Sequence, residues 1–344
     1  MFKRSKTAKA SSENGSASSG SEVDADGVPA PRAPATRPSP KPLKTSEVKD
    51  LAKLAKRMIF GTNEQRRALQ GEGVNIIPAN FYSEVPTLDE LDDAFEYRET
   101  TPFDLPFLDP DKVAAAYDAL VPYAQDFNPP LEDPGDELAF YWRNPAFSYC
   151  DAMVYYAMIR RERPAHILEF GSGYSSRVAA EALKANGEGK LSCLEPFPME
   201  WLRRLDCNLI EKKAQDLTAE ALNDMLADGD ILFIDSTHTV KFGSDCLHIY
   251  LRLLPKLRRK LMVHVHDIYL PFGMPLEGAQ RRHIYWTEQY LLHAFMLFND
   301  RCEFELGNVY GRRFTPEAQK RLMHGRYPNA GASWWFKWLG SDWK

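Results

Sequence analysis

The sequence predicts an α/β fold: a Rossmann-like, mostly parallel sheet that follows a helical cap and a polar N-terminal tail. From residue 165 onwards, short apolar runs alternate with helical patterns, which is typical of parallel strands covered by helices on both faces. One of these runs, Ile167–Phe170, leads into a glycine turn that opens a helix. The 344 residues are 44% hydrophobic and 26% charged, which is ordinary for a globular protein.

The N-terminal third of the chain divides into a tail and a cap. Residues 1–44 are mainly Ser, Ala, Pro, Gly and Lys and can bury little, so we predict that they are disordered. Apolar spacing over 46–60 predicts an amphipathic helix, which we interpret as a peripheral helix packed on the domain, not a membrane-surface helix. Residues 45–136 therefore form a helix and cap segment, with two further helices expected at 88–97 and 111–123.

Residues 137–344 carry the alternating pattern of the main domain. Strands are expected at 165–170, 190–195, 208–212, 230–235, 260–267, 302–310 and 332–339. Helices are expected at 144–161, 175–185, 198–205, 218–227, 241–254 and 281–298. The aromatic run Trp334-Trp335-Phe336-Lys337-Trp338 is interpreted as a strand packed on both faces, not as a membrane anchor.

Composition excludes several classes of protein. The net charge of −5 gives no electrostatic argument for nucleic acid as a partner. No apolar run approaches the ~20 residues that a membrane span requires, and the N-terminus lacks the apolar core of a signal peptide. The five cysteines are scattered without a C-x-x-C pair, which favours free thiols in a reducing compartment, and we expect a cytoplasmic protein.

The glycine turn carries the cofactor prediction. A dinucleotide fingerprint, G-x-G-x-x-G, would place a third glycine where this chain has Ser176. Glu169, before the turn, can hold an ammonium group and suits a pyrophosphate poorly. S-adenosylmethionine combines an ammonium, a carboxylate, a ribose and a purine, so we predict it as the cofactor. The candidate residues at the turn are Glu169, Gly171, Ser172, Gly173 and Ser175.

Three more acids extend the predicted cofactor site. Glu195 ends the next strand, 24 residues after Gly171, where a carboxylate can accept both ribose hydroxyls. NAD-dependent dehydrogenases share this feature, so it does not separate the two cofactors. Asp216 is a candidate to bound the adenine, with a helix N-cap as the alternative. Asp235, at the end of the 230–235 strand, is the last cofactor-binding candidate.

Polar residues at two later strand ends mark the predicted reacting site. Asp235 is followed at short range by His238, and the next strand ends in His264-Val265-His266-Asp267. Histidine is the natural base near neutral pH, so His238 and His266 are the candidate general bases, with Asp267 as a third catalytic residue. His264 is interpreted as structural. Asp235 and Asp267 are also candidates for a divalent metal, which we do not expect to be required.

These motifs together resemble the class I S-adenosylmethionine-dependent methyltransferases. The chain is most similar to a bacterial-type subgroup of largely unassigned substrate, over about residues 71–344. The phrases that carry this narrower resemblance are Asn80-Phe81-Tyr82-Ser83, His266-Asp267-Ile268-Tyr269-Leu270-Pro271 and Glu288-Gln289-Tyr290-Leu291-Leu292. The resemblance implies a seven-stranded sheet whose last strand is antiparallel. The chain departs from many members at Ser175, where they have a third glycine; a small residue still fits there.

The function predicted from these observations is O-methylation of a small-molecule acceptor, with a histidine general base. An NAD-dependent oxidoreductase and a non-catalytic S-adenosylmethionine-binding partner protein remain as alternatives. The loop 269–275 is expected to form an acceptor pocket or lid, or else to pack under the next helix. Arg281, Arg282 and His283 are expected to open that helix and to meet an anionic acceptor. The sequence determines neither the acceptor nor the oligomeric state.

Overall fold

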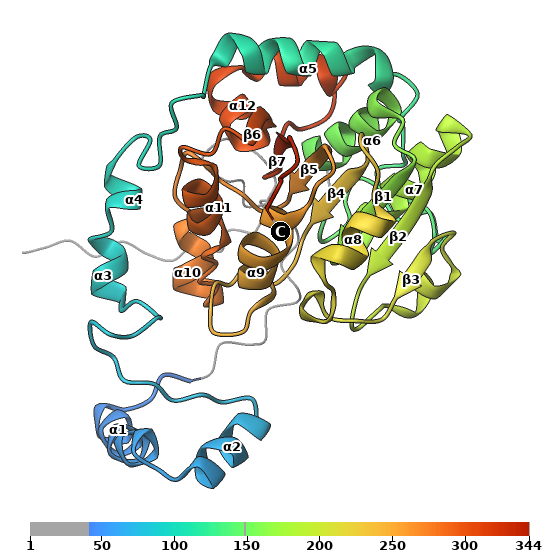
Figure 1. The fold of residues 1–344 in the computed structure, drawn as a ribbon. Helices are drawn as coiled ribbons and strands as arrows, with labels where there is room; N and C mark the ends of the chain where they lie inside the picture. Colours follow the sequence, from blue (N-terminus) through green and yellow to red (C-terminus); the bar gives the residue numbers. More distant parts are fainter. Residues whose placement is uncertain (1–40, 148, 344) are drawn as a thin grey trace, which may run out of the picture.

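The computed structural model describes residues 41–147 and 149–343, and these contain one seven-stranded sheet with helices on both faces (Figure 1). The strands are β1 (His166–Phe170), β2 (Lys190–Leu194), β3 (Asn208–Ile210), β4 (Ile231–Ile234), β5 (Leu261–Val265), β6 (Cys302–Gly307) and β7 (Trp334–Trp338). Their order is β3-β2-β1-β4-β5-β7-β6. Only β7 runs antiparallel to its neighbours, so the predicted fold class is confirmed.

Alternation along each strand divides the core into two layers. Ile167 and Phe233 face one layer, and Leu168 and Leu232 face the other. The first layer is built from α5 (Pro110–Ala124), α6 (Cys150–Glu162), α7 (Tyr174–Asn186) and α13 (Pro316–Leu322). The second is built from α8 (Ala219–Met225), α9 (Asp245–His248), the π-helical turn Ile249–Leu253 and α11 (Glu288–Met296). Burial on both faces explains the nearly continuous apolar runs of the strands.

The aromatic strand β7 pairs with β5 on one side and β6 on the other. Trp334 and Trp335 are fully buried, one in each core layer. The interpretation of this run as a strand packed on both faces is therefore confirmed.

Helix α5 belongs structurally to the main core, although its sequence lies in the expected cap segment. Asp109 caps it by accepting the backbone N–H of Asp111 at 2.9 Å, and Pro110 occupies its first position. Tyr117 and Leu120 are fully buried against the sheet domain. In Figure 1, α5 lies across the domain beside α12 (Asn308–Phe314) and β6.

Several predicted helices are divided differently in the structure. The helix expected over 281–298 is two: α10 (Leu276–Arg282) stops at His283, whose φ of 55° is left-handed, and α11 begins at Glu288. Arg281 and Arg282 thus occupy a helix C-terminus, where the dipole favours cations, so the argument that placed them at an N-terminus was wrong. The helix over 88–97 is likewise split, into α3 (Leu88–Asp92) and α4 (Phe95–Arg98).

The N-terminal helices do not pack on the sheet domain. α1 (Thr45–Ile59) and α2 (Asn63–Gly71) bury no residue and lie apart from the sheet at the bottom of Figure 1. Leu51 and Leu54 of α1 remain 56% and 55% exposed, so the prediction of a docked peripheral helix was wrong. The predicted disorder of residues 1–40 falls outside the described residues.

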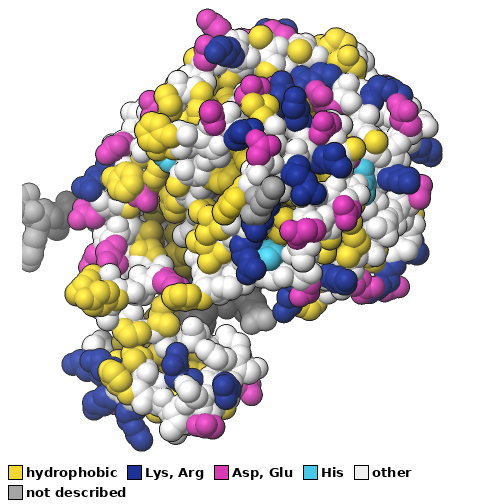
Figure 2. All heavy atoms as spheres, viewed as in Figure 1, with side chains coloured by type: hydrophobic (Ala, Val, Ile, Leu, Met, Phe, Trp, Pro, Cys, Tyr) yellow, Lys and Arg dark blue, Asp and Glu magenta, His cyan; other side chains and the backbone are white. Residues whose placement is uncertain are grey.

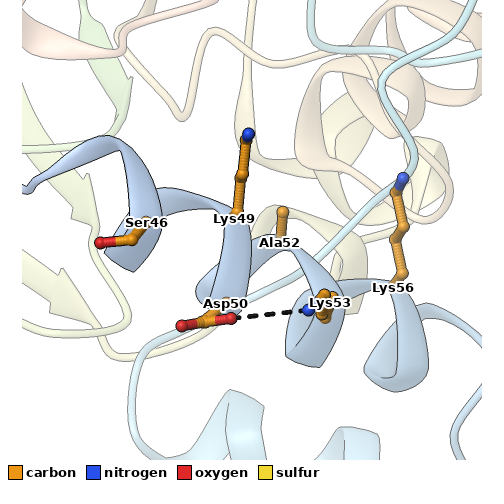
Figure 3. A pocket seen from close by; sticks show the side chains of 6 residues that line it. All are labelled: Ser46, Lys49, Asp50, Ala52, Lys53 and Lys56. Carbon is orange, nitrogen blue, oxygen red and sulfur yellow. Dashed lines mark ion pairs between the residues drawn. The ribbon is translucent and has the colours of Figure 1, made fainter.

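The polar side of α1 is a solvated basic face. Lys49, Lys53 and Lys56 project from it, and Lys53 pairs with Asp50 at 3.7 Å (Figure 3). Basic side chains also gather at the lower left of the space-filling view (Figure 2). Exposed pairs of this kind contribute little to stability. Within the described residues, no helix is long and apolar enough to cross a membrane.

Candidate active site

The glycine turn lies where the strand order reverses, since β1 sits between β2 and β4. In open α/β sheets ligands bind outside the carboxyl ends of the strands at this point. Gly171 has φ of +80°, and a Cβ there would lie 1.8 Å from the carbonyl oxygen of Asp235, so only glycine fits. A Cβ at Gly173 would meet nothing within 4 Å. The turn is therefore closed against β4 at its first glycine and open at its second.

Glu169 braces this turn from below. It is fully buried; its Oε1 accepts a hydrogen bond from Tyr155 Oη at 3.0 Å, and its Oε2 accepts one from Ser176 Oγ. Ser176 Oγ in turn accepts the backbone N–H of Gly173 at 3.1 Å. Burial raises the pKa of Glu169 to about 7, against the opposing effect of the hydroxyl groups. Glu169 has no exposed surface, so an ammonium group could contact this carboxylate only if the surrounding side chains moved.

Glu195 joins the ends of β1 and β2. Its Oε1 accepts the backbone N–H of Phe197 at 2.8 Å, and its Oε2 accepts that of Ser172 at 3.4 Å. The side chain remains partly exposed beside the turn. Among the other predicted cofactor residues, Ser175 is buried in the first turn of α7.

Asp216 lies farther out and is exposed. Its Oδ2 accepts the backbone N–H of Lys213 at 3.1 Å, which caps the short 3-10 turn Ala214–Asp216. The alternative that it caps the following helix was wrong, because Thr218 is the N-cap of α8.

His238 meets carboxylates through both ring nitrogens. Its Nε2 lies 3.1 Å from Asp235 Oδ1 and 3.7 Å from Asp267 Oδ2. Its Nδ1 lies 2.8 Å from Oε2 of Glu288, which is buried at the start of α11. Tyr250 Oη donates to the other oxygen of Glu288 at 2.8 Å. The ring thus lies between the buried Glu288, which we call an inner carboxylate, and the partly exposed carboxylates of Asp235 and Asp267.

His266 repeats this arrangement from the neighbouring strand. Its Nδ1 lies 3.4 Å from Asp235 Oδ1 and 3.7 Å from Asp267 Oδ2, the same two oxygens that His238 faces. Its Nε2 lies 3.2 Å from Oδ2 of the buried Asp151 in α6. Asn308 Nδ2 donates to Asp151 Oδ1 at 2.7 Å. The structure therefore brings Asp235, His238, His266 and Asp267 together in one group, which we call the Asp–His cluster.

The cluster is strongly coupled electrostatically. Burial disfavours a charge on His238, but hydrogen bonds to Asp235 and Glu288 outweigh it and raise its pKa to about 10. The pKa of His266 is also raised, because Asp267 and Asp235 overcome the cost of burial. Burial raises the pKa of Asp267, whereas the two imidazoles lower that of Asp235 despite its burial.

The carboxylates form the accessible part of this cluster. The side chains of Asp235 and Asp267 are 30% and 23% exposed, against 7% and 6% for His238 and His266. His238 and Asp267 both have φ of 55°, an uncommon conformation for residues other than glycine. The carbonyl of His238 accepts the backbone N–H groups of Thr287 and Glu288, at 2.8 and 3.0 Å, which ties this strand end to α11. A molecule approaching from solvent meets the two carboxylates first.

Sequence reasoning missed the two inner carboxylates, Asp151 and Glu288. Asp151 lies in a helix where every residue from Cys150 to Ile159 is buried, so a lone acid in an apolar run was the available signal. Glu288 opens a phrase that supported the resemblance but was given no role. His264 faces elsewhere: its Nε2 lies 2.7 Å from Ser333 Oγ, and its ring stacks on Trp335 at 3.9 Å.

Comparison with known proteins places this geometry in a family. The family model described as "Methyltransferase domain" matches residues 168–268, which include the glycine turn and both polar strand ends. An uncharacterised protein of Archaeoglobus fulgidus is 31% identical over 153 residues, covering 41% of this chain and 69% of that protein.

Two solved structures are more distantly similar. A putative O-methyltransferase from Klebsiella pneumoniae has a TM-score of 0.34 and 14% identity, covering 66% of this chain and 90% of its own. The plantazolicin methyltransferase BamL, solved with a triazolic desmethylPZN analog and SAH, has a TM-score of 0.33 and 12% identity, covering 73% of this chain and 90% of its own.

The chain belongs to the class I S-adenosylmethionine-dependent methyltransferases. Its cofactor is accordingly S-adenosylmethionine, and the alternative of an NAD-dependent oxidoreductase is set aside. The residues present fit this cofactor. The second glycine of the turn leaves open space above the backbone, and the carboxylate of Glu195 stands beside it.

Proposed function

We propose that this protein transfers the methyl group of S-adenosylmethionine to a hydroxyl oxygen of a small-molecule acceptor. The contact of Gly171 with the carbonyl of Asp235 carries this proposal, because it makes the cofactor turn and the Asp–His cluster neighbours. Methyl transfer to a hydroxyl needs the donor and acceptor in line and a group that removes one proton. An ionisable cluster beside the turn meets the second need.

The cofactor supplies an activated methyl group, and the proposed role of the glycine turn is to bind the cofactor. Ser172, Gly173 and Ser175 are proposed to shape the space for its amino-acid end, and Glu195 to accept its ribose hydroxyls. Asp216 is proposed to bound the adenine from the outer side. Glu169 supports the turn from beneath, since both of its oxygens are bonded within the protein.

Proton removal is proposed for the exposed side of the cluster. Asp267 reaches the accessible side, and the Nε2 of His238 lies 3.7 Å behind its Oδ2. In this proposal the acceptor proton passes to Asp267, whose pKa is raised by burial. His238 and His266, whose pKa values are also raised, stay protonated and stabilise the negative charge of Asp235. His238, His266 and Asp267 thus remain the proposed catalytic residues, with the carboxylate in front of the imidazoles.

The acceptor is proposed to enter through a basic pocket beside the cluster. Three arginines and one acid line it, Arg98, Arg312, Arg313 and Glu99, and Phe272 is contributed by the loop after β5. Leu270 of that loop is fully buried, so the loop also packs into the core. Burial and the charge of Asp267 raise the pKa of Tyr269, whereas the charge of Arg312 lowers it. Tyr269 therefore lies within electrostatic range of both the cluster, through Asp267, and the pocket, through Arg312. We propose that the arginines select an acceptor bearing a negative group.

The proposal is tested in two steps. Isothermal titration of the full chain with S-adenosylhomocysteine measures cofactor binding, and methyl-labelled S-adenosylmethionine with a panel of small anionic alcohols, phenols, amines and thiols measures transfer. We expect binding, and label in an ether or ester product of at least one acceptor. Binding together with label only on nitrogen or sulfur acceptors would contradict the choice of oxygen.

A further inference from the structure

We propose that the Asp–His cluster is a binding site for a divalent transition metal ion. Three donor atoms converge from the ends of β4 and β5: Asp235 Oδ1, His238 Nε2 and Asp267 Oδ2. His266 Nδ1 lies 3.4 and 3.7 Å from the same two aspartate oxygens. The ligand atoms of Asp235, His238 and Asp267 lie within 4.8 Å of one another. That spacing suits one ion between them, with bonds of about 2.0–2.2 Å from nitrogen and oxygen.

The surroundings of the two histidines are those of metal ligands. A metal-bound imidazole almost always donates its other ring N–H to a carboxylate, carbonyl or water, which fixes the ring and raises its basicity. Here both rings have such a partner: Glu288 lies 2.8 Å from His238 Nδ1, and Asp151 lies 3.2 Å from His266 Nε2. These inner carboxylates are themselves anchored, by Tyr250 and Asn308. Each ring is therefore oriented with its free nitrogen toward the same two aspartates.

A buried nitrogen aimed into the cluster is a second, independent observation. His266 is 4% exposed, and its Nδ1 has no well-directed hydrogen bond although it lies 3.4 Å from Asp235 Oδ1. A buried polar atom without such a bond costs free energy unless something else satisfies it. A metal ion bound by the two neighbouring aspartates would do so.

The balance of charge points the same way. Four carboxylates, of Asp151, Asp235, Asp267 and Glu288, surround two imidazoles. Within the described part of the chain, no lysine or arginine forms an ion pair with any of the four. A divalent cation would reduce this excess of negative charge.

The donor set indicates the kind of metal. Mg²⁺ and Ca²⁺ prefer sites made entirely of oxygen, whereas imidazole suits Zn²⁺, Cu²⁺, Fe²⁺ and Ni²⁺. Two imidazole nitrogens with two carboxylate oxygens therefore favour a transition metal. A cation here would lower the pKa of a hydroxyl brought beside it. That catalytic consequence rests on the proposed function; the binding of the metal does not.

The test uses the full-length protein, stripped with EDTA, dialysed and titrated with Co²⁺. We expect one Co²⁺ per chain, visible absorption bands of an imidazole-containing site, and displacement by Zn²⁺ measured by elemental analysis. Asp267→Asn, which keeps a side chain suited to φ of 55°, and Glu288→Gln, which keeps hydrogen-bonding atoms beside His238, should each weaken Co²⁺ binding about 10–100-fold. His293→Gln, at a histidine outside the cluster, is the matched control and should bind as the wild type does.

Cofactor binding on the same samples separates this inference from the proposed function. A wild-type protein that takes up neither Co²⁺ nor Zn²⁺ overturns the metal site, as does uptake that Asp267→Asn and Glu288→Gln leave unchanged. If the stripped protein methylates its acceptor at full rate and takes up neither Co²⁺ nor Zn²⁺, the proposed function stands and the metal site fails. If Co²⁺ binds as expected but no hydroxyl acceptor is methylated, the metal site stands and the proposed function fails.

Discussion

The acids at two places along the carboxyl ends of the strands have opposite surroundings. Under the glycine turn, Glu169 is satisfied by the neutral hydroxyls of Tyr155 and Ser176, and burial raises its pKa to about 7. At the ends of β4 and β5, Asp235 and Asp267 face imidazoles instead and remain partly exposed. Neutral donors hold a fully buried carboxyl group in place, whereas imidazoles and solvent access allow protons or a cation to be exchanged. The first group supports the turn; the second is the candidate for chemistry.

The largest expected effect comes from forcing the two groups apart. Gly171→Ala places a methyl group 1.8 Å from the carbonyl oxygen of Asp235 at a φ of +80°, so β1 and β4 must separate. We expect a loss of at least about 3–4 kcal/mol in the free energy of unfolding, or failure to fold. Urea unfolding followed by circular dichroism measures it. Gly173→Ala meets nothing within 4 Å, so it should fold and lose mainly cofactor affinity. Equal stability of the two variants would mean that the turn and β4 are not in contact.

The second prediction tests whether the Asp–His cluster, unlike Glu169, is required for methyl transfer. Asp267→Asn should lower methyl transfer about 10²–10⁴-fold, because the exposed proton-accepting or metal-binding carboxylate is lost. The thermal midpoint should change little, since asparagine tolerates the φ of 55°. Asp118→Asn, which breaks an exposed ion pair with Arg321, is the control. If Asp267→Asn kept full activity or phenotype, the alternative of a non-catalytic cofactor-binding protein would be favoured.

The third effect tests whether Glu169 is a neutral support. Its pKa is raised from 4.5 to about 7 in the folded protein, so its stabilising contribution is full below pH 4.5 and is lost as the pH rises through 7. Glu169→Gln mimics the protonated form and should gain up to about 3 kcal/mol over the wild type at pH 8, but little at pH 4.5. Unfolding free energies of both proteins at the two pH values give the comparison. A difference that does not change with pH would show that folding does not raise the pKa of Glu169.

The smallest expected effect concerns Glu195, the proposed contact for the ribose of the cofactor. Glu195→Gln should weaken S-adenosylhomocysteine binding by about 1.5–3 kcal/mol, the value of hydrogen bonds to a charged acceptor. Titration calorimetry measures it, with Glu211→Gln on the same outer edge as the control, since Glu211 pairs only with exposed Arg203. Unchanged affinity would remove Glu195 from the ribose contact.

Local pattern was sufficient for the sheet and for part of the site. All seven strands were predicted, and for β1, β2, β4, β5 and β7 burial on both faces leaves a signal within four or five residues. The glycine turn and the polar ends of β4 and β5 were visible for the same reason. Helix boundaries near 283 and 94 were not, since a left-handed residue or a short break leaves the apolar spacing nearly intact. The edge strands β3 and β6 are less buried, and the strand expected over 302–310 was too long, because α12 begins at Asn308.

The sequence by itself determined which residues end the strands: Gly171, Asp235, His238, His266 and Asp267. Only the tertiary structure decided which buried carboxylates contact the two histidines. Glu288 is 50 residues from His238, and Asp151 is 115 residues from His266, so neither pairing lies within reach of a local pattern. Tertiary packing also decided that α1 buries nothing, although its amphipathic spacing is that of a docked helix. Periodicity records which face of an element is apolar, whereas the partner of that face is fixed by contacts across the whole chain.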